Sequence, residues 1–174
     1  MGAKHVVVLP YDAAWRLDFA KIRDELAEAL GKLALRIEHV GSTSVPGLSA
    51  KPIIDIDVVI RDYAVFDKVV AALGTVGYRH EGNLGIVGRE AFKYDGKEHL
   101  RNHHLYVCTE DSPELRRHLA FRDYLRTNPD AVKEYSRIKE EAAARYPYDI
   151  DGYIAYKSPL IERIYAEIGL AEQQ

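Results

Sequence analysis

Two aspartates in one apolar stretch are the residues best placed to do chemistry. Asp55 and Asp57 belong to IIDIDVVI, at positions 53–60. Alternate residues of a strand face the same side, so the two Cα atoms lie roughly 6.6 Å apart with both carboxylates on one face. Like charges there gain little unless a cation lies between them. A divalent cation, Mg²⁺ or Mn²⁺, is therefore the expectation; the alternative is a half-buried strand whose acidic face meets water.

A Gly-Ser-Thr-Ser turn lies shortly before this strand, at Gly41, Ser42, Thr43 and Ser44. Glycine lets the backbone approach a ligand closely, and successive N–H groups together with hydroxyl donors form a nest for an anion. A phosphate would fit such a nest. Glycine and serine are also common in ordinary turns. The turn and the paired acids together are more specific than either feature alone.

Several basic and imidazole side chains are candidates for the same site. Lys51 shares the parity of the two aspartates and could neutralise a phosphate, although a solvated lysine is the alternative. In NHHLYVC (102–108), parity places His104 opposite the apolar Leu105 and Val107. His104 is therefore a candidate metal ligand or proton acceptor. Arg101 is a candidate anion clamp, as are three other basic residues that are individually more typical of a protein surface, Arg89, Lys93 and Lys157.

Other polar residues favour structural interpretations. His39 shares the parity of the apolar residues that precede it, so a buried core histidine and a site histidine are both open. The charged segment KEEAAAR, at 139–145, is typical of an exposed helix face.

The first half of the chain predicts an α-β-β-α order. A helix is expected from Asp12 to Gly31, with its apolar residues at three-to-four-residue spacing. Strands are expected at 33–40 and 53–60, the second with Ile54, Ile56, Val58 and Ile60 on its core face. A second helix follows Asp62 and ends at Gly74.

The second half predicts a long hairpin followed by helices. Two strands between 77 and 110 are joined by a turn at Asp95-Gly96. A helix opens with Ser112 as its cap, and Asn128-Pro129 separates it from the next helix. A last helix, at about 152–168, contains Pro159, which predicts a kink or two short helices.

Composition limits the class of protein. A chain of 174 residues is expected to form one domain, over 1–174. The net charge of −3 argues against general affinity for nucleic acids. A single cysteine, Cys108, forms no internal disulfide, and the N-terminal apolar run is short for a signal peptide, so a cytoplasmic location without membrane attachment is expected.

Four longer stretches resemble the GrpB family of bacterial proteins, nearly end to end: IEHVGSTSVPGLSAKPIIDIDV, RNHHLYV, RRHLAFRDYLR and AYKSPLIERI. That family is similar in turn to the nucleotidyltransferase superfamily. The resemblance implies an α+β fold, a nucleotidyltransferase-like mixed sheet with flanking helices and a helical C-terminal third. It implies Gly41-Ser42 as the phosphate turn and Asp55 and Asp57 as metal ligands. The superfamily's third carboxylate is missing here, and His104 stands as the candidate for its place.

The implied function is a metal-dependent nucleotidyltransferase that binds a nucleoside triphosphate and acts on an unknown acceptor. Asp55, Asp57 and His104 would be catalytic and metal-binding, with Gly41–Ser44, Lys51 and Arg101 holding the phosphates. The missing carboxylate favours an alternative, a non-catalytic nucleotide- or anion-binding module that supports a partner enzyme. Family members fused to dephospho-CoA kinase make that enzyme a possible associate. A metal-dependent hydrolase is the third option.

Overall fold

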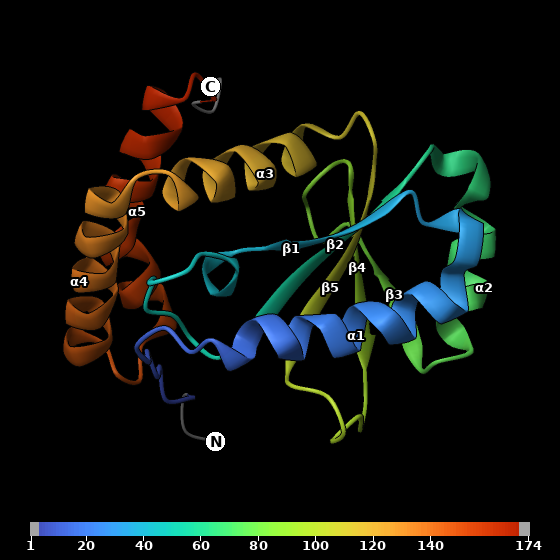
Figure 1. Cartoon of the computed structure of the whole chain (residues 1–174), viewed down its shortest axis with the longest axis horizontal. Coiled ribbons are helices and arrows are strands. Elements are labelled where there is room, and N and C mark those ends of the chain that lie inside the picture. Colours follow the sequence, from blue (N-terminus) through green and yellow to red (C-terminus); the bar gives the residue numbers. More distant parts are fainter. Residues whose placement is uncertain (1–3, 171–174) are drawn as a thin grey trace.

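A computed structural model describes residues 4–170 and places five strands of this range in one mixed sheet (Figure 1). The spatial order is β1-β2-β5-β4-β3. Strand β2 pairs in parallel with β5, and the other neighbours are antiparallel. The strands are β1 (Arg36–Val40), β2 (Ile54–Ile60), β3 (Tyr78–Gly82), β4 (Arg89–Tyr94) and β5 (His103–Thr109).

One face of the sheet is covered by α1 (Ala14–Leu30) and α2 (Phe66–Gly74) (Figure 1). The apolar stripe of α1 is buried, as the spacing predicted: Trp15, Phe19, Ile22, Leu26 and Leu30. It packs against the core face of β2, whose four predicted residues are each at most 1% exposed. The Asp12 carboxylate accepts a bond from the Ala14 amide, and Asp62 does the same for Ala64. Local capping and apolar periodicity therefore fix this layer.

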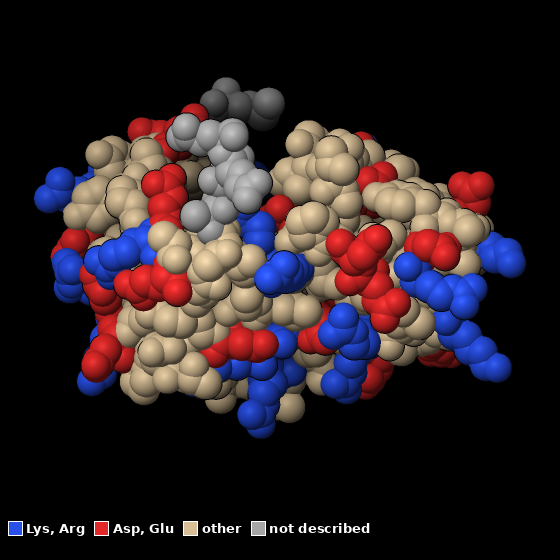
Figure 2. All heavy atoms as spheres, turned by 90° about the horizontal axis from the view of Figure 1, so that it is seen from above, with Lys and Arg blue, Asp and Glu red and all other residues tan. Residues whose placement is uncertain are grey.

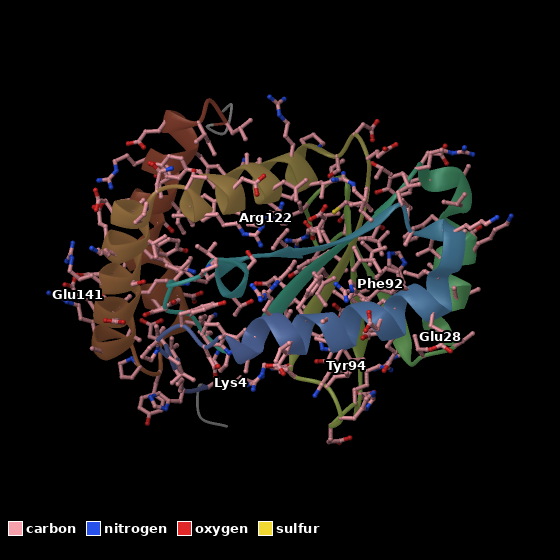
Figure 3. The ribbon with its side chains drawn as sticks, viewed as in Figure 1. Lys4, Glu28, Phe92, Tyr94, Arg122 and Glu141 are labelled. Carbon is pink, nitrogen blue, oxygen red and sulfur yellow. The ribbon has the colours of Figure 1, made fainter. Side chains whose placement is uncertain are left out.

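The helical C-terminal third covers part of the opposite face. Helix α3 (Pro113–Arg126) crosses it, with Leu115 packed on Val59 and Cys108. Helices α4 (Pro129–Arg145) and α5 (Ile150–Glu167) pack together at one end of the sheet (Figure 1). Figure 3 shows Arg122 extending from α3 toward β1. The expected α+β class, with flanking helices and a helical C-terminal third, is confirmed.

Two elements differ in extent from the sequence prediction. Residues Gly31–Leu33 form a 3₁₀ turn, so β1 begins at Arg36 rather than at position 33. Helix α5 begins at Ile150, with Asp149 as its cap, and runs as one helix through Pro159. The two short helices that Pro159 suggested are therefore absent from the described chain. The Ser158 hydroxyl donates to the Ile154 carbonyl beside the proline.

The hairpin prediction was right in its strands and wrong in its turn. Strands β4 and β5 pair antiparallel, but residues 95–102 form a loop rather than a tight turn. The loop is tied to α1, because Lys97 and His99 both contact Glu25. The edge strand β3 escaped prediction: its middle residues are exposed, and its register shifts between His80 and Gly82. A short exposed strand with a bulge has no apolar alternation to detect.

Charged side chains of both signs are interspersed over the face seen in Figure 2, in keeping with the small net charge. No helix within residues 4–170 combines the length and the apolar character needed to cross a bilayer.

Candidate functional site

The Gly41 turn is built against the Asp55 side chain. Gly41 has φ of 72°, a conformation that favours glycine. A Cβ at this position would lie 3.0 Å from Cβ and Cγ of Asp55, closer than ordinary contact. The turn continues as a 3₁₀ segment, Ser42–Ser44, in which the Ser44 hydroxyl donates to the Gly41 carbonyl at 2.5 Å. Gly41 thus leaves room for a carboxylate, and Ser44 closes the turn.

His39 is a core histidine that supports the same turn. It is 7% exposed and stacks on Phe19 with ring centroids 4.6 Å apart. Burial lowers the pKa of His39 to about 4, so the ring is neutral at pH 7. Its Nε2 lies 2.9 Å from the Thr43 hydroxyl. Of the two open interpretations of His39, the structure supports the buried one, and His39 orients Thr43 from behind.

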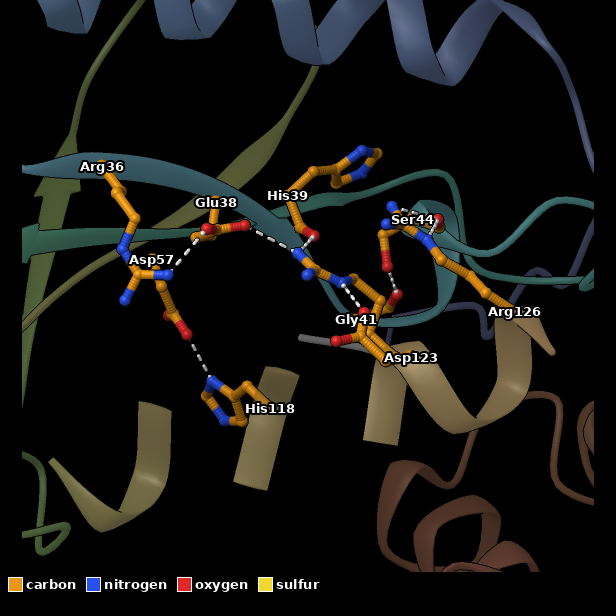
Figure 4. A network of polar contacts seen from close by, with 10 residues as sticks. Arg36, Glu38, His39, Gly41, Ser44, Asp57, His118, Asp123 and Arg126 are labelled. Carbon is orange, nitrogen blue, oxygen red and sulfur yellow. Dashed lines mark hydrogen bonds and ion pairs between the residues drawn. The ribbon is translucent and has the colours of Figure 1, made fainter. Parts of the chain in front are cut away.

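Two arginines of α3 fix the end of β1 (Figure 4). Arg126 donates twice to the Ser44 carbonyl, at 3.0 and 2.9 Å. Arg122 donates to the His39 carbonyl at 3.1 Å and to Glu38 at 2.8 Å. Bonds from a charged donor are stronger than neutral ones. The turn is therefore held from both sides, by the sheet and by α3.

The turn opens into a small cavity of about 140 Å³. Its polar lining combines one carboxylate and one imidazole with three lysines and two hydroxyl groups of the turn. These residues are Ser42, Thr43, Lys51, Asp55, His104, Lys139 and Lys157, with the Tyr153 ring beside them. Three amines around one carboxylate give the cavity an excess of positive charge, which is the character of a site for an anion.

Lys139 and Lys157 reach this cavity from α4 and α5. Lys139 is 2% exposed and its Nζ donates to the Ser42 hydroxyl. Burial, followed by the nearby Lys157, lowers the pKa of Lys139 well below its usual value. Burial, followed by Lys51, lowers the pKa of Lys157 to about 8. An anion placed among these amines would relieve their mutual repulsion and favour their charged forms.

The expected exposed face for 139–145 is wrong at Lys139. The spacing of residues on α4 indicates that Lys139 is buried. Three and four residues separate successive members of a buried stripe formed by Val132, Tyr135, Lys139 and Ala142. Because lysine is usually exposed, the residue type at position 139 favoured an exposed position over a buried one.

Asp55 and His104 lie side by side on neighbouring strands. They are register partners in the parallel β2–β5 pair, and His104 Nδ1 lies 2.9 Å from Asp55 Oδ1. Leu105 and Val107 are buried in the core, so the predicted parity of the NHHLYVC strand is correct. The side chains of His104 and Asp55 are 52% and 32% exposed, so a ligand can reach both.

Asp57 lies two residues further along and is fully buried. The Nδ1 atom of His118, from α3, lies 2.6 Å from Asp57 Oδ2 (Figure 4). The Nε2 atom of His118 lies 3.3 Å from Glu114 Oε1. Burial alone would lower the pKa of His118, but hydrogen bonds to Asp57 and then Glu114 raise it to about 9. His118 is therefore an imidazolium that neutralises Asp57. His118 was not among the predicted site residues, although its spacing from Leu115 and Leu125 places it on the inward stripe of α3.

The two aspartates thus share a strand face but not a partner. Within the described residues, no cluster of three His, Cys, Asp or Glu side chains is arranged to hold a metal. Asp57 Oδ1 is buried and has no hydrogen-bond partner in that same part of the chain. The carboxylates of Asp55 and Asp57 remain the oxygen donors to consider for a cation.

Three basic candidates lie elsewhere. Arg101 Nε pairs with Asp18 of α1 at 2.5 Å, and Arg101 does not line the lysine cavity. The Arg89 guanidinium lies 4.1 Å from the centroid of the Tyr106 ring, and Lys93 Nζ lies 4.0 Å from Glu81. Of the expected phosphate-binding residues, the structure brings Ser42, Thr43 and Lys51 to the cavity.

A family model described as "GrpB protein" matches residues 5–167. The chain belongs to the GrpB family. A glutamate-rich protein GrpB from Alkalihalophilus pseudofirmus is 32% identical, over 94% of this chain and 95% of its own length. YqkA of Bacillus subtilis is 35% identical over 91% of this chain, which spans only 46% of YqkA. A dephospho-CoA kinase of Mycolicibacterium paratuberculosis is 31% identical over 92% of this chain, and the match covers 45% of the kinase's length.

Solved structures agree with this membership. The GrpB protein of Enterococcus faecalis superposes with a TM-score of 0.79 at 32% identity, over 94% of this chain and 99% of its own. The Cid1 poly(U) polymerase, solved with MgGTP bound, superposes with a TM-score of 0.55 at 12% identity, over 78% of this chain and 44% of its own. At that identity the likeness establishes the fold alone. This GrpB-family chain has a nucleotidyltransferase-like fold.

Proposed function

We propose that this chain is a metal-dependent nucleotidyltransferase, which binds a nucleoside triphosphate by its phosphates and transfers the nucleotidyl group to an acceptor. The observation that carries the proposal is the cluster of Lys51, Lys139 and Lys157 around Asp55, beside the Ser42 hydroxyl. A chain with a net charge of −3 has gathered three amines in one small cavity. Such a cluster is costly unless an anion occupies it.

The carboxylates fit a hard divalent cation. Mg²⁺ takes one or two protein carboxylates and completes its shell with water and substrate phosphates, so a cluster of three protein ligands is not required. Asp57 Oδ1 is a buried anionic oxygen without a hydrogen bond in the described chain, and His118 engages only the other oxygen. Asp55 and Asp57 would hold the ion, with His118 orienting Asp57. Such an ion would neutralise negative charge on the substrate phosphates.

In the reaction, an acceptor hydroxyl attacks the α-phosphorus, a P–O bond forms, and the bond to the departing pyrophosphate breaks. The lysines stabilise the charge that develops on the leaving phosphates. His104, exposed and within reach of the same centre, accepts the acceptor's proton, and Asp55 stabilises the imidazolium that results. Ser42, held by Lys139, orients the phosphates from the turn.

One observation favours a second function, a non-catalytic module that binds a nucleotide or another phosphate-bearing ligand. His118 already neutralises Asp57, so one of the two carboxylates has a protein-borne cation as its partner. The match within a dephospho-CoA kinase supports a role beside a nucleotide-using enzyme. This module would bind the ligand saturably and release no pyrophosphate.

Thermal unfolding with each of the four nucleoside triphosphates, with and without Mg²⁺ or Mn²⁺, tests both functions. A ligand at about 100 times its dissociation constant adds about 2.7 kcal/mol, which shifts the midpoint by roughly 5–10 °C in a chain of this size. Lys157→Met should reduce the shift, and Lys68→Met, on the exposed side of α2, should keep it. No shift with any nucleotide would contradict the transferase and would restrict the module to another phosphate-bearing ligand.

Pyrophosphate release then separates the transferase from the binding module. Asp55→Asn should abolish release while leaving the fold intact, and Asp24→Asn, on the exposed face of α1, is the matched control. Full turnover by Asp55→Asn would overturn the transferase. A metal-dependent shift without release, across a panel of hydroxyl acceptors, would favour the module.

A further inference from the structure

The lysine cavity is too small for a whole nucleotide. Its volume is about 140 Å³, whereas sites for ligands of nucleotide size measure about 300–1,000 Å³. If phosphates occupy the lysine cavity, the sugar and the base must lie outside it. The shape of the neighbouring surface determines where the sugar and the base can bind.

A second cavity, of about 410 Å³, adjoins the first through His104, which lines both. It lies over β3, β4 and β5, and His104 and Tyr106 stand on the same side of β5 as Asp55 and Asp57 do on β2. The sequence of sites across the sheet is therefore lysines, Asp55, His104 and then this second cavity.

The second cavity has a different chemistry from the first. Its charged residues are one acid and one base, Glu81 and Lys93, 4.0 Å apart. Its other polar walls are two imidazoles, two phenols and one amide, from His103, His104, Tyr94, Tyr106 and Asn102. The Asn102 amide oxygen accepts a bond from the Tyr94 hydroxyl at 3.0 Å. A balanced charge with aromatic and amide groups suits an uncharged ring system that carries hydrogen-bonding atoms.

Ala91 and Leu84 shape this cavity. Ala91 is the register partner of Tyr106 and is 2% exposed, so the smallest side chain of β4 lies beside the Tyr106 ring. Leu84, in the loop between β3 and β4, is 61% exposed with φ of 52° and lines the cavity. Holding a non-glycine residue in this left-handed conformation costs energy, and such strained residues cluster at ligand-binding sites.

We propose that the nucleoside part of the ligand binds in this second cavity, with its base between Leu84 and the Tyr106–Ala91 surface. The inference rests on the proposed function, since it takes the phosphates in the lysine cavity as given. This subsite would allow the protein to bind a nucleoside triphosphate more tightly than inorganic polyphosphate. Stacking of a base on an aromatic or apolar surface should contribute roughly tenfold in affinity, which is equivalent to about 1.4 kcal/mol.

Calorimetric titration of the full chain with ATP, GTP, CTP, UTP and inorganic tripolyphosphate tests the inference. At least one nucleoside triphosphate should bind roughly tenfold more tightly than tripolyphosphate. Ala91→Leu should fill the cavity and reduce that ligand to the affinity of tripolyphosphate, whose own binding stays unchanged. Leu84→Ser, on the exposed rim, should weaken the nucleotide about threefold or more and needs no change in the core.

The outcomes separate the two proposals. Nucleotide preference that survives both Ala91→Leu and Leu84→Ser would overturn the nucleoside subsite while leaving the lysine cavity intact. Equal affinities for all five ligands would also overturn it. Nucleotide binding that depends on Ala91, without any binding of tripolyphosphate, would keep the subsite and contradict the lysine cavity. Lys157→Met should weaken all five ligands, and should Ala91→Leu not fold, Leu84→Ser alone decides.

Discussion

Asp55 and Asp57 are two residues apart on one strand face, yet they lie in opposite surroundings. Asp55 is partly exposed, faces three lysines and touches His104, which solvent also reaches. Asp57 is fully buried beside α3 and is bonded through one carboxylate oxygen to a charged His118, which leaves its other oxygen without a hydrogen bond in the described residues. The comparison shows that a strand pattern identifies a face, whereas the elements packed on that face decide what each residue does. We expect Asp55 to contribute mainly to ligand binding, and Asp57 to contribute to both ligand binding and the stability of the fold.

The largest expected effect is on stability, from removal of the buried carboxylate. Asp57→Ala leaves the His118 imidazolium buried with one partner fewer, and breaking a buried charge pair costs about 3–5 kcal/mol. Asp55→Ala, at a partly exposed position, should cost about 1 kcal/mol or less. Urea unfolding of the two variants measures the difference. Equal losses would contradict the contrast between the two aspartates.

The pH dependence of stability should follow His118. Its pKa is about 9 in the folded chain and near 6.5 when unfolded, so its contribution is fully present below pH 6.5 and is lost as pH rises through 9. The size is about 3 kcal/mol. Because Lys157 has a lowered pKa and titrates in the opposite sense, the quantity to measure is the difference between wild type and His118→Gln from pH 6 to 9.5. A difference that stays constant over this range would show that His118 is not charged in the fold.

Gly41→Ala should combine strain with a clash against Asp55. A left-handed conformation costs a non-glycine residue about 1–2 kcal/mol. Gly31→Ala is the matched control, because its φ is 52° and an added Cβ meets nothing within 4 Å. The loss at Gly41 should exceed that at Gly31 by about 1 kcal/mol or more, and only Gly41→Ala should impair phosphate binding. Thermal unfolding and tripolyphosphate titration measure the two effects.

The smallest effect concerns affinity near Asp55. The proposed phosphate binding would need the charged form of Lys157, whose pKa is about 8, so affinity for tripolyphosphate should fall as pH rises from 7 to 9. A decrease of about tenfold is expected, equivalent to about 1.4 kcal/mol. Lys157→Met should lose that part of the pH dependence, while the ligand's own titration affects both proteins alike. Parallel pH profiles for the two proteins would contradict a role for Lys157.

Local signals in the sequence were sufficient for much of the fold. The stripe of α1, the cap at Asp62 and the alternation of β2 each depend on neighbours within a few residues, and the structure agrees with all three. Failures came where distant contacts override local preference. The conformation of the 95–102 loop depends on its contact with Glu25 of α1. Pro159 remains inside α5, which packs on α4.

The candidate site divides in the same way. Parity on two strands was enough to place Asp55 beside His104. Nothing local indicates that Lys139 reaches Ser42 or that His118 reaches Asp57, since the first pair is separated by 97 positions and the second by 61. Spacing on α3 and α4 marks both residues as inward-facing, but their partners appear only when the helices pack on the sheet.

The contact between Lys139 and Ser42 also has a kinetic meaning. It joins the helical end of the molecule to the turn after β1, across most of the length of the chain. Contacts so distant in sequence form late, after loop closure has been achieved. A partly folded chain with its sheet and α1 in place would therefore hold both aspartates and no phosphate pocket. Under the proposed function, ligand binding would thus be confined to molecules that have completed folding, and hydrogen exchange should slow in α4 and in the turn together when ligand is added.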